Sequence, residues 1–203
     1  MLDDNLLTQV RGHFGNIVHP VELIATVDAS EKSGELRRLL DQLDSASEKI
    51  TVRYDGTDER TPSFVISRVG TDVQVRFAGL PLGHEFTSLI LAVLQVGGHP
   101  PKAGDDTIEQ IKALEGRYDF VTYMSLSCQN CPDVVQALNA MSVLNPNIRH
   151  IAIDGALFQD EVEARQVMAV PTVFLNGEPF DSGRMTIDQI LGKLDTGAVE
   201  REA

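Results

Sequence analysis

Apolar positions along this chain follow the period of a helix in some stretches and that of a buried strand in others, and one order of stretches occurs twice. In the first copy, apolar residues three or four apart predict amphipathic helices, and short apolar runs predict strands. The predicted elements of the first copy are a helix at 6–14, a strand at 21–27, a helix at 36–43, a strand at 50–54, a strand at 61–66 and a helix at 86–96.

The second copy repeats this order between residues 107 and 194. Its predicted elements are a helix at 107–114, a strand at 120–124, a helix from about 128 to 144, a strand at 148–153, a strand at 170–175 and a helix at 186–194. Thr107 with Gln110 and Thr186 with Gln189 have the spacing of capping boxes, which predicts a helix start at each. Asn176-Gly177 predicts a hairpin turn before a last strand.

The repeat predicts an α/β protein made of two fused folds, each a central mixed β-sheet flanked by helices. Two glycines and two prolines within residues 97–101 interrupt the helical pattern and predict the junction. We expect one fold over residues 1–98 and the other over 99–195. Residues 196–203 then form the start of a linker.

Composition and charge restrict the partners. Apolar residues make up 42% of the 203 residues and charged residues 23%, which is typical of a globular chain. The net charge of −13 repels phosphate backbones and anionic lipid surfaces, so we expect no nucleic acid and no membrane as partner. The acidic start of the chain is unlike a secretory signal, and a cytoplasmic location is predicted.

The two cysteines of the chain, Cys128 and Cys131, lie between a predicted strand and a predicted helix. Residues three apart in a helix are close enough for a disulfide, and a helix N-terminus stabilises a thiolate. Pro132 suits an early helical position, where its missing N–H costs little. We therefore predict a redox-active pair, with Cys128 as the exposed nucleophile and Cys131 as the resolving thiol.

Two other interpretations of the pair remain. The cysteines could be inert and buried, or they could form half of a zinc site. Zinc usually needs four ligands, and the histidines are scattered at positions 13, 19, 84, 99 and 150. Redox chemistry is favoured for that reason, and no metal site is predicted.

The first copy has no cysteine at the corresponding place, residues 28–33, so it is predicted to be redox-silent and to act as a scaffold or a docking surface. Each copy has a proline at the start of a strand, Pro62 and Pro171. Such a proline can simply mark an edge strand. In a thioredoxin-like repeat it is cis and lies against the cysteine pair, and we expect this for Pro171.

Several runs closely resemble the amino-terminal domain of the F subunit of alkyl hydroperoxide reductase, a flavoprotein. They are PVELIAT (20–26), FAG (77–79), PLGHEFTSL (81–89), SLSC (125–128), NCPDVVQALN (130–139) and GRMT (183–186). The resemblance covers essentially the whole chain and implies two fused thioredoxin-like folds that share one active Cys-x-x-Cys.

The resemblance also implies an electron route and its partners. Electrons would pass from NADH to FAD, then to a second cysteine pair, to Cys128 and Cys131, and finally to the disulfide of a peroxiredoxin, the C subunit of alkyl hydroperoxide reductase. FAD and NADH would belong to a flavin domain that follows in the full-length protein. No G-x-G-x-x-G fingerprint occurs in this chain, so we expect no cofactor here beyond the cysteine pair. The full-length protein could form a homodimer.

Glu85 is implied by the resemblance as a buried acid–base group, contributed by the first copy, for the proton of Cys131. The alternative is a helix-start glutamate stabilised by the macrodipole. Gln129 departs from the family, in which we expect histidine between the cysteines. A source of positive charge near the thiolate is then missing.

The sequence therefore predicts a dithiol electron carrier, a disulfide oxidoreductase that needs an external electron donor and reduces a peroxiredoxin in peroxide detoxification. A general protein disulfide reductase or isomerase is the alternative enzyme. A non-catalytic docking or dimerisation module is the alternative from another class, and an unreactive Cys128 would favour it.

Overall fold

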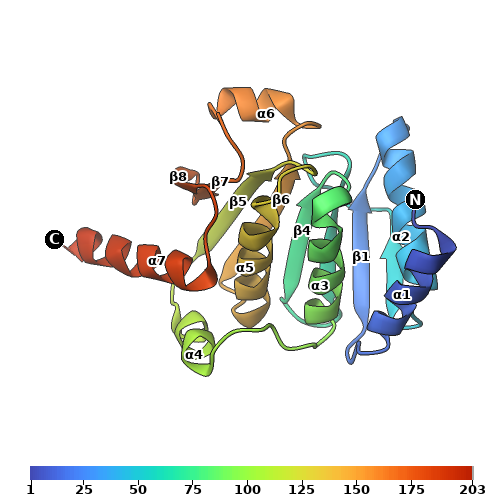
Figure 1. Cartoon of the computed structure of the whole chain (residues 1–203), viewed down its shortest axis with the longest axis horizontal. Helices are drawn as coiled ribbons and strands as arrows, with labels where there is room; N and C mark the ends of the chain where they lie inside the picture. Colours follow the sequence, from blue (N-terminus) through green and yellow to red (C-terminus); the bar gives the residue numbers. More distant parts are fainter. Residues whose placement is uncertain (203) are drawn as a thin grey trace.

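The computed structural model describes the backbone of residues 1–202 and the side chains of residues 1–194. Eight strands form one mixed sheet in the order β2-β1-β3-β4-β6-β5-β7-β8. Helices α1, α3 and α5 lie together over one face of this sheet, and α6 lies apart from them, at the top of the molecule in Figure 1.

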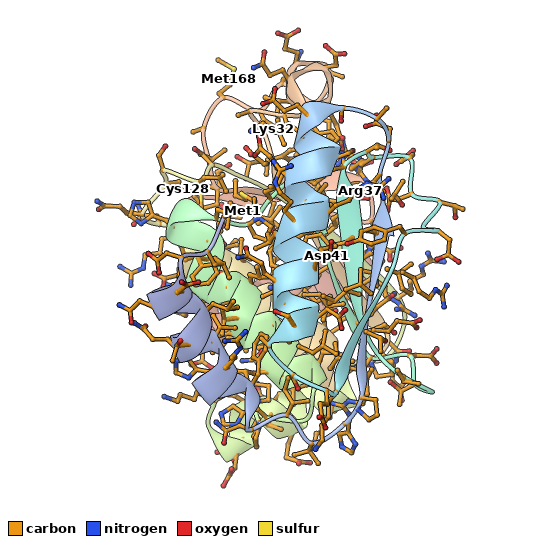
Figure 2. All side chains as sticks on the ribbon, turned by 90° about the vertical axis from the view of Figure 1, so that its right-hand side faces the viewer. Met1, Lys32, Arg37, Asp41, Cys128 and Met168 are labelled. Carbon is orange, nitrogen blue, oxygen red and sulfur yellow. A yellow bond between two sulfur atoms is a disulfide. The ribbon has the colours of Figure 1, made fainter. Side chains whose placement is uncertain are left out.

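The first copy of the repeat occupies the right half of Figure 1. Its elements are α1 (Asp4–Phe14), β1 (Val21–Thr26), α2 (Glu31–Ser45), β2 (Ile50–Arg53), β3 (Ser63–Arg68), β4 (Gln74–Ala78), the short 3-10 helix η1 (Gly83–Glu85) and α3 (Phe86–Val96). The apolar positions that predicted α2, Leu36, Leu39, Leu40 and Leu43, are all fully buried. Figure 2 shows α2 along its length, with Lys32, Arg37 and Asp41 projecting from it.

The second copy has the same order with one addition. Its elements are α4 (Asp105–Ala113), β5 (Tyr118–Met124), α5 (Cys131–Leu144), β6 (Ile148–Asp154), α6 (Gln159–Ala164), β7 (Thr172–Leu175), β8 (Glu178–Ser182) and α7 (Ile187–Glu202). The sequence pattern did not predict α6. No residue of this short helix is buried, so it carries no apolar period to be recognised.

Matching hydrogen bonds confirm that the chain is an internal repeat. The N–H of Gly79 donates to Pro62 O at 2.9 Å, and the N–H of Gly183 donates to Pro171 O at the same distance. The peptide bonds before both prolines are cis. In each copy the first strand is parallel to the second and antiparallel to the third.

A parallel pair, β4 with β6, joins the two copies edge to edge. Pairing of these two strands leaves neither copy with an open inner edge, which is an arrangement that avoids unpaired backbone groups. The cores merge as well, because Met124, Cys131, Val135 and Ala152 of the second copy belong to the buried cluster centred on the first. The two predicted sheets are thus one continuous sheet. The domain division at residues 98 and 99 stays a prediction.

Two details of the predicted second copy were wrong. Thr107 does not cap a helix: α4 begins earlier, at Asp105, and the Thr107 hydroxyl donates to Asp188 Oδ1 at 2.9 Å. Helix α5 begins at Cys131 rather than near residue 128, because residues 125–128 form a turn in which the N–H of Cys128 donates to Ser125 O.

Other predicted details are confirmed. Thr186 and Gln189 exchange the two hydrogen bonds of a capping box, at 2.9 and 3.2 Å. Asn176 and Gly177 have positive φ values, 50° and 83°, in the turn between β7 and β8. Residues 97–101 lie between α3 and α4, and their role as the junction stays a prediction.

The predicted linker, residues 196–203, is at the end of the chain. Residues up to Glu202 continue α7, which extends past β8 at the left of Figure 1. Residue 203 and the side chains beyond residue 194 lie outside the described residues, so the linker over 196–203 stays a prediction. Within the described residues, no helix combines the length and the apolar character needed to cross a membrane.

Candidate redox site

The cysteine pair lies at the start of α5. Cys128 and Cys131 form a disulfide with 5.5 Å between their Cα atoms. Asn130 is at the N-cap position of the helix without a side-chain capping hydrogen bond, and Pro132 occupies the first turn. Cys131 is fully buried, whereas Cys128 is partly exposed. The N–H of Cys131 donates to the Sγ of Cys128 at 3.1 Å.

The turn before the pair is held by the first copy. The N–H of His84, in η1, donates to Leu126 O at 2.9 Å. Gly83 adopts a positive φ of 56°, and a Cβ added there would come within 2.7 Å of the same oxygen. Only a glycine allows this close approach without a shift. The thiol-free copy therefore contributes directly to the position of the residues that precede Cys128.

The backbone of Val170, just before Pro171, lies near the pair. The peptide bond between these two residues is cis, and Val170 O lies 3.8 Å from the Sγ of Cys128. Val170, Leu126 and Cys128 pack against one buried cluster, together with Leu82 and Phe86 on either side of Glu85. The disulfide thus lies where loops from both copies meet.

Glu85 is buried in the same region. Its side chain is 0% exposed, and neither carboxylate oxygen has a hydrogen-bond partner in the described part of the chain. Burial raises the pKa of Glu85 to about 7, and the nearby Ser88 hydroxyl lowers it by a smaller amount. That hydroxyl is not in hydrogen-bonding geometry with the carboxylate; it accepts from Gln136 Nε2, on α5, at 3.0 Å.

An ionisable group without a partner is costly to bury, and a raised pKa makes such a group a candidate for proton transfer. Helix η1, which ends at Glu85, contacts α5, whose first residue is Cys131. The structure thus brings the carbonyl of Val170, which precedes Pro171, to Cys128, and it buries Glu85 on an element that contacts α5. The catalytic roles of Cys128, Cys131, Glu85 and Pro171 stay predictions.

Sequence reasoning missed Val170, Leu126 and Gln136 as parts of this site. None of the three has a pattern of its own. Leu126 and Val170 act through backbone carbonyls, which every residue carries, and Gln136 is one of several polar residues on α5. The one sequence signal for Val170 is its position directly before Pro171.

The corresponding place in the first copy is closed by its own hydrogen bonds. The N–H of Ser30 and the hydroxyl of Ser33 donate to Asp28 Oδ1 at 2.9 and 2.8 Å. Hydrogen bonds from Ser30, and then from Ser33, lower the pKa of Asp28 to about 2. No group of three or more histidine, cysteine, aspartate or glutamate residues in the described part of the chain could hold a metal ion.

Known proteins share both the sequence and the fold of this chain. The model of the Thioredoxin domain family matches residues 121–196. The F subunit of alkyl hydroperoxide reductase from Pseudomonas aeruginosa is 60% identical over all of this chain, which covers 39% of that protein. The chain therefore spans about two fifths of the length of the curated relatives it matches.

Two solved structures from Enterococcus faecalis (V583) are similar over nearly the whole chain. The NTD_N/C domain of alkylhydroperoxide reductase AhpF superposes with a TM-score of 0.87 at 29% identity, covering 96% of this chain and 100% of that one. A cysteine-to-alanine mutant of AhpF superposes with a TM-score of 0.86 at 30% identity, covering 95% and 99%.

Proposed function

This chain belongs to the family of the alkyl hydroperoxide reductase F subunit, in which it corresponds to the N-terminal domain, and we propose that it carries electrons from a flavin domain to the disulfide of a peroxiredoxin. Its fold and its redox disulfide support an oxidoreductase role. The donor, the acceptor and the direction of electron flow are the parts that we propose.

The pairing of a partly exposed cysteine with a buried one is the observation that carries the proposal. Cys128 is partly exposed just before α5, and Cys131 behind it is fully buried. A carrier needs this asymmetry, because one thiol must meet the partner and the other must be kept for the second step. A docking module would have no use for it.

The reaction transfers two electrons. In the reduced state, the Cys128 thiolate attacks one sulfur of the partner disulfide; an S–S bond to Cys128 forms, and the other partner sulfur leaves as a thiolate and takes up a proton. The Cys131 thiol then loses its proton and attacks the Sγ of Cys128. The Cys128–Cys131 disulfide forms, and the partner's second sulfur leaves as a thiolate that takes up a proton.

Glu85 is suited to the second step. Cys131 is buried and can attack only after a proton has left its sulfur. A carboxyl group with a pKa near 7 is ionised in about half of the molecules at neutral pH, so it can accept that proton and later return it. We assign Glu85 this acid–base role, supported by its burial without a partner and by the contact between η1 and α5.

Electrons reach the pair by the reverse exchange with another dithiol. FAD and NADH would supply them through the part of the full-length protein that this chain does not span. The thiol exchange at Cys128 and Cys131 itself requires only residues of this chain. The full-length protein, as a homodimer or otherwise, would work in the cytoplasm, where dithiols are kept reduced.

The test is single-turnover reduction of the oxidised C subunit of alkyl hydroperoxide reductase by this chain, reduced beforehand with dithiothreitol and freed of it. The wild type should reduce the peroxiredoxin, Cys128→Ser should be inactive, and Cys131→Ser should accumulate a mixed disulfide that gel electrophoresis without reductant detects. Turnover by Cys128→Ser would refute the proposal.

The same assay separates the alternatives. A general disulfide reductase would reduce insulin as fast as the peroxiredoxin. An isomerase would have a reduction potential of about −180 mV, whereas the reduction potential of a reductase would be about −270 mV.

A further inference from the structure

The segment between β6 and Pro171, residues 155–170, lies on the surface of the molecule. None of its residues is buried, and the segment includes α6. Figure 1 shows α6 standing off the top of the sheet, away from the other helices. We call residues 155–170 the α6 segment. Its apolar side chains Leu157, Phe158, Val162, Val167 and Val170 are only partly buried against the core. Polar contacts therefore add to what holds the segment in place.

An ion pair from the first copy holds it. The Arg60 guanidinium donates two hydrogen bonds to the Glu161 carboxylate, Nη2 to Oε1 at 2.7 Å and Nε to Oε2 at 3.0 Å. Both side chains are partly buried, 13% and 24% exposed, so the pair is less screened than a surface pair. The two residues are 101 positions apart and belong to different copies.

Two further contacts anchor the same segment to the sheet. The Tyr123 hydroxyl donates to Glu161 Oε1 at 2.6 Å. The Arg165 guanidinium lies over the ring of Phe174, 4.7 Å from its centroid. Glu161 is thus fixed by groups of both copies.

Arg60 is itself held in place by its neighbours in the first copy. Its N–H donates to Asp58 Oδ1 at 2.8 Å, and its carbonyl accepts from the Ser63 hydroxyl at 2.6 Å. The backbone that carries the guanidinium is therefore fixed at two points. A fixed cation can define where the Glu161 carboxylate, and with it α6, lies.

The α6 segment ends at the redox site. Its last residue, Val170, has its carbonyl 3.8 Å from the Sγ of Cys128. Two positions earlier, Met168 is 92% exposed, which is unusual for a large apolar side chain. Figure 2 shows Met168 projecting from the molecule above the level of Cys128. A partner whose disulfide reaches Cys128 must approach this segment.

We propose that the Arg60–Glu161 ion pair positions the α6 segment for docking of the partner protein, so that the thiol-free copy sets affinity for the protein disulfide without touching the reacting sulfurs. The occupant is the backbone and apolar side chains that flank the partner's disulfide, with Met168 as the flexible apolar contact. The partner's identity rests on the proposed function, but the docking role itself requires only a protein disulfide.

A positioning role predicts a split between binding and chemistry. Arg60→Gln should raise the concentration of oxidised peroxiredoxin at half-saturation by about fivefold, because a loosened segment must be ordered on binding. The limiting rate at saturation should stay within about twofold of the wild type, since the thiols are unchanged. The rate with 5,5′-dithiobis(2-nitrobenzoic acid), a small disulfide that needs no docking surface, should also stay within that range.

Three variants complete the experiment. Met168→Gln should raise the half-saturation concentration in the same way. The double variant Arg60→Glu with Glu161→Arg reverses the two charges of the ion pair. It should restore part of the affinity that each single substitution removes. Arg53→Gln is the control, because the more exposed Arg53–Glu22 pair has a similar distance, 2.9 Å, but joins the strands β1 and β2 rather than the α6 segment. It should leave both rates and the half-saturation concentration unchanged.

An unchanged half-saturation concentration in Arg60→Gln would overturn the inference. Equal losses of reaction rate with the protein disulfide and with the small disulfide would also overturn it, because they would show general damage to the fold. If the wild type fails to reduce the peroxiredoxin at all, the proposed function fails instead. The same series with insulin as the protein disulfide then still tests the positioning role.

Discussion

The N–H of Cys131 donates to the Sγ of Cys128 across 3.1 Å, at the first turn of α5. A sulfur in this position faces the unpaired N–H groups and the positive end of the helix dipole, both of which stabilise a thiolate. The helix itself therefore favours a thiolate at Cys128, as the proposed role of the attacking sulfur requires. Side chains around it can adjust that reactivity, and Gln129 lies between the two cysteines.

Gln129→His should make the reactivity of Cys128 depend on pH below neutrality. A protonated imidazole beside the sulfur stabilises the thiolate, and this effect fades as the pH rises through about 6.5, where the imidazole loses its charge. We expect the reduced variant to react with iodoacetamide several times faster than the wild type at pH 6 and at a similar rate at pH 8. Gln129→Asn is the control. Identical pH profiles for all three proteins would contradict the prediction.

Glu85→Gln should slow resolution of the mixed disulfide. The wild-type rate should rise with pH as the Glu85 carboxyl ionises near pH 7. Glutamine cannot accept a proton, so the variant should lack this rise and be slower by about tenfold or more at pH 8. Stopped-flow mixing of the reduced protein with a preformed partner disulfide measures this step. A variant that keeps the wild-type pH profile would exclude Glu85 as the base.

The same substitution should stabilise the fold at high pH. The pKa of Glu85 is raised from 4.5 to about 7 by burial, so its contribution to stability is fully present below pH 4.5 and is lost as the pH rises through 7. At pH 8 the buried charge costs on the order of 3 kcal/mol, which Glu85→Gln removes. Urea unfolding at pH 4 and pH 8 should show a gain only at pH 8. A gain of equal size at both values would mean that the effect is not ionisation.

His150 should make the fold sensitive to acid. Its ring is buried between the Thr122 hydroxyl, 2.8 Å from Nε2, and Asn139 Oδ1, 2.7 Å from Nδ1. Burial, and then the charge of Arg76, lowers the pKa of His150 from 6.5 to about 3. A group with a lowered histidine pKa stabilises the fold above pH 6.5 and loses this contribution as the pH falls toward 3.

The measurement is the change of unfolding free energy with pH in the wild type and in His150→Gln. Between pH 6 and 4 the histidine should cost about 1.4 kcal/mol per pH unit, and the variant should lack this component. Glu85 acts in the opposite direction between pH 7 and 4.5, so the comparison is best made in a Glu85→Gln background. Equal slopes with and without His150 would refute the assignment.

Gly83→Ala should disturb the redox site from the first copy. The new Cβ would lie 2.7 Å from Leu126 O, so the turn before Cys128 must shift. Gly70→Ala is a matched control, because Gly70 also has a positive φ, 76°, but no atom within 4 Å of an added Cβ. Both variants should lose about 1 kcal/mol from the backbone conformation. Only Gly83→Ala should lose more, and only it should slow reduction of the peroxiredoxin. Equal behaviour of the two would show that the contact with Leu126 is unimportant.

Much of the local structure could be predicted because its signals are local. The leucines of α2, the capping box of Thr186 and Gln189, and the turn at Asn176 and Gly177 each depend on residues a few positions apart. The wrong start of α5 follows from the same rule. Residues 125–128 form a turn that no apolar period marks, so the pattern alone placed the helix too early.

By itself, the sequence determined that the chain is a repeat with one cysteine pair between a strand and a helix, because spacing along the chain is enough to specify both. The tertiary structure decided that β4 and β6 join the copies into one sheet, that Glu85 is buried on an element that contacts α5, and that Arg60 meets Glu161. These relations depend on which edges and loops of distant segments come together. Pairing of that kind is set by packing of the whole chain, so it cannot be predicted from any short stretch of residues.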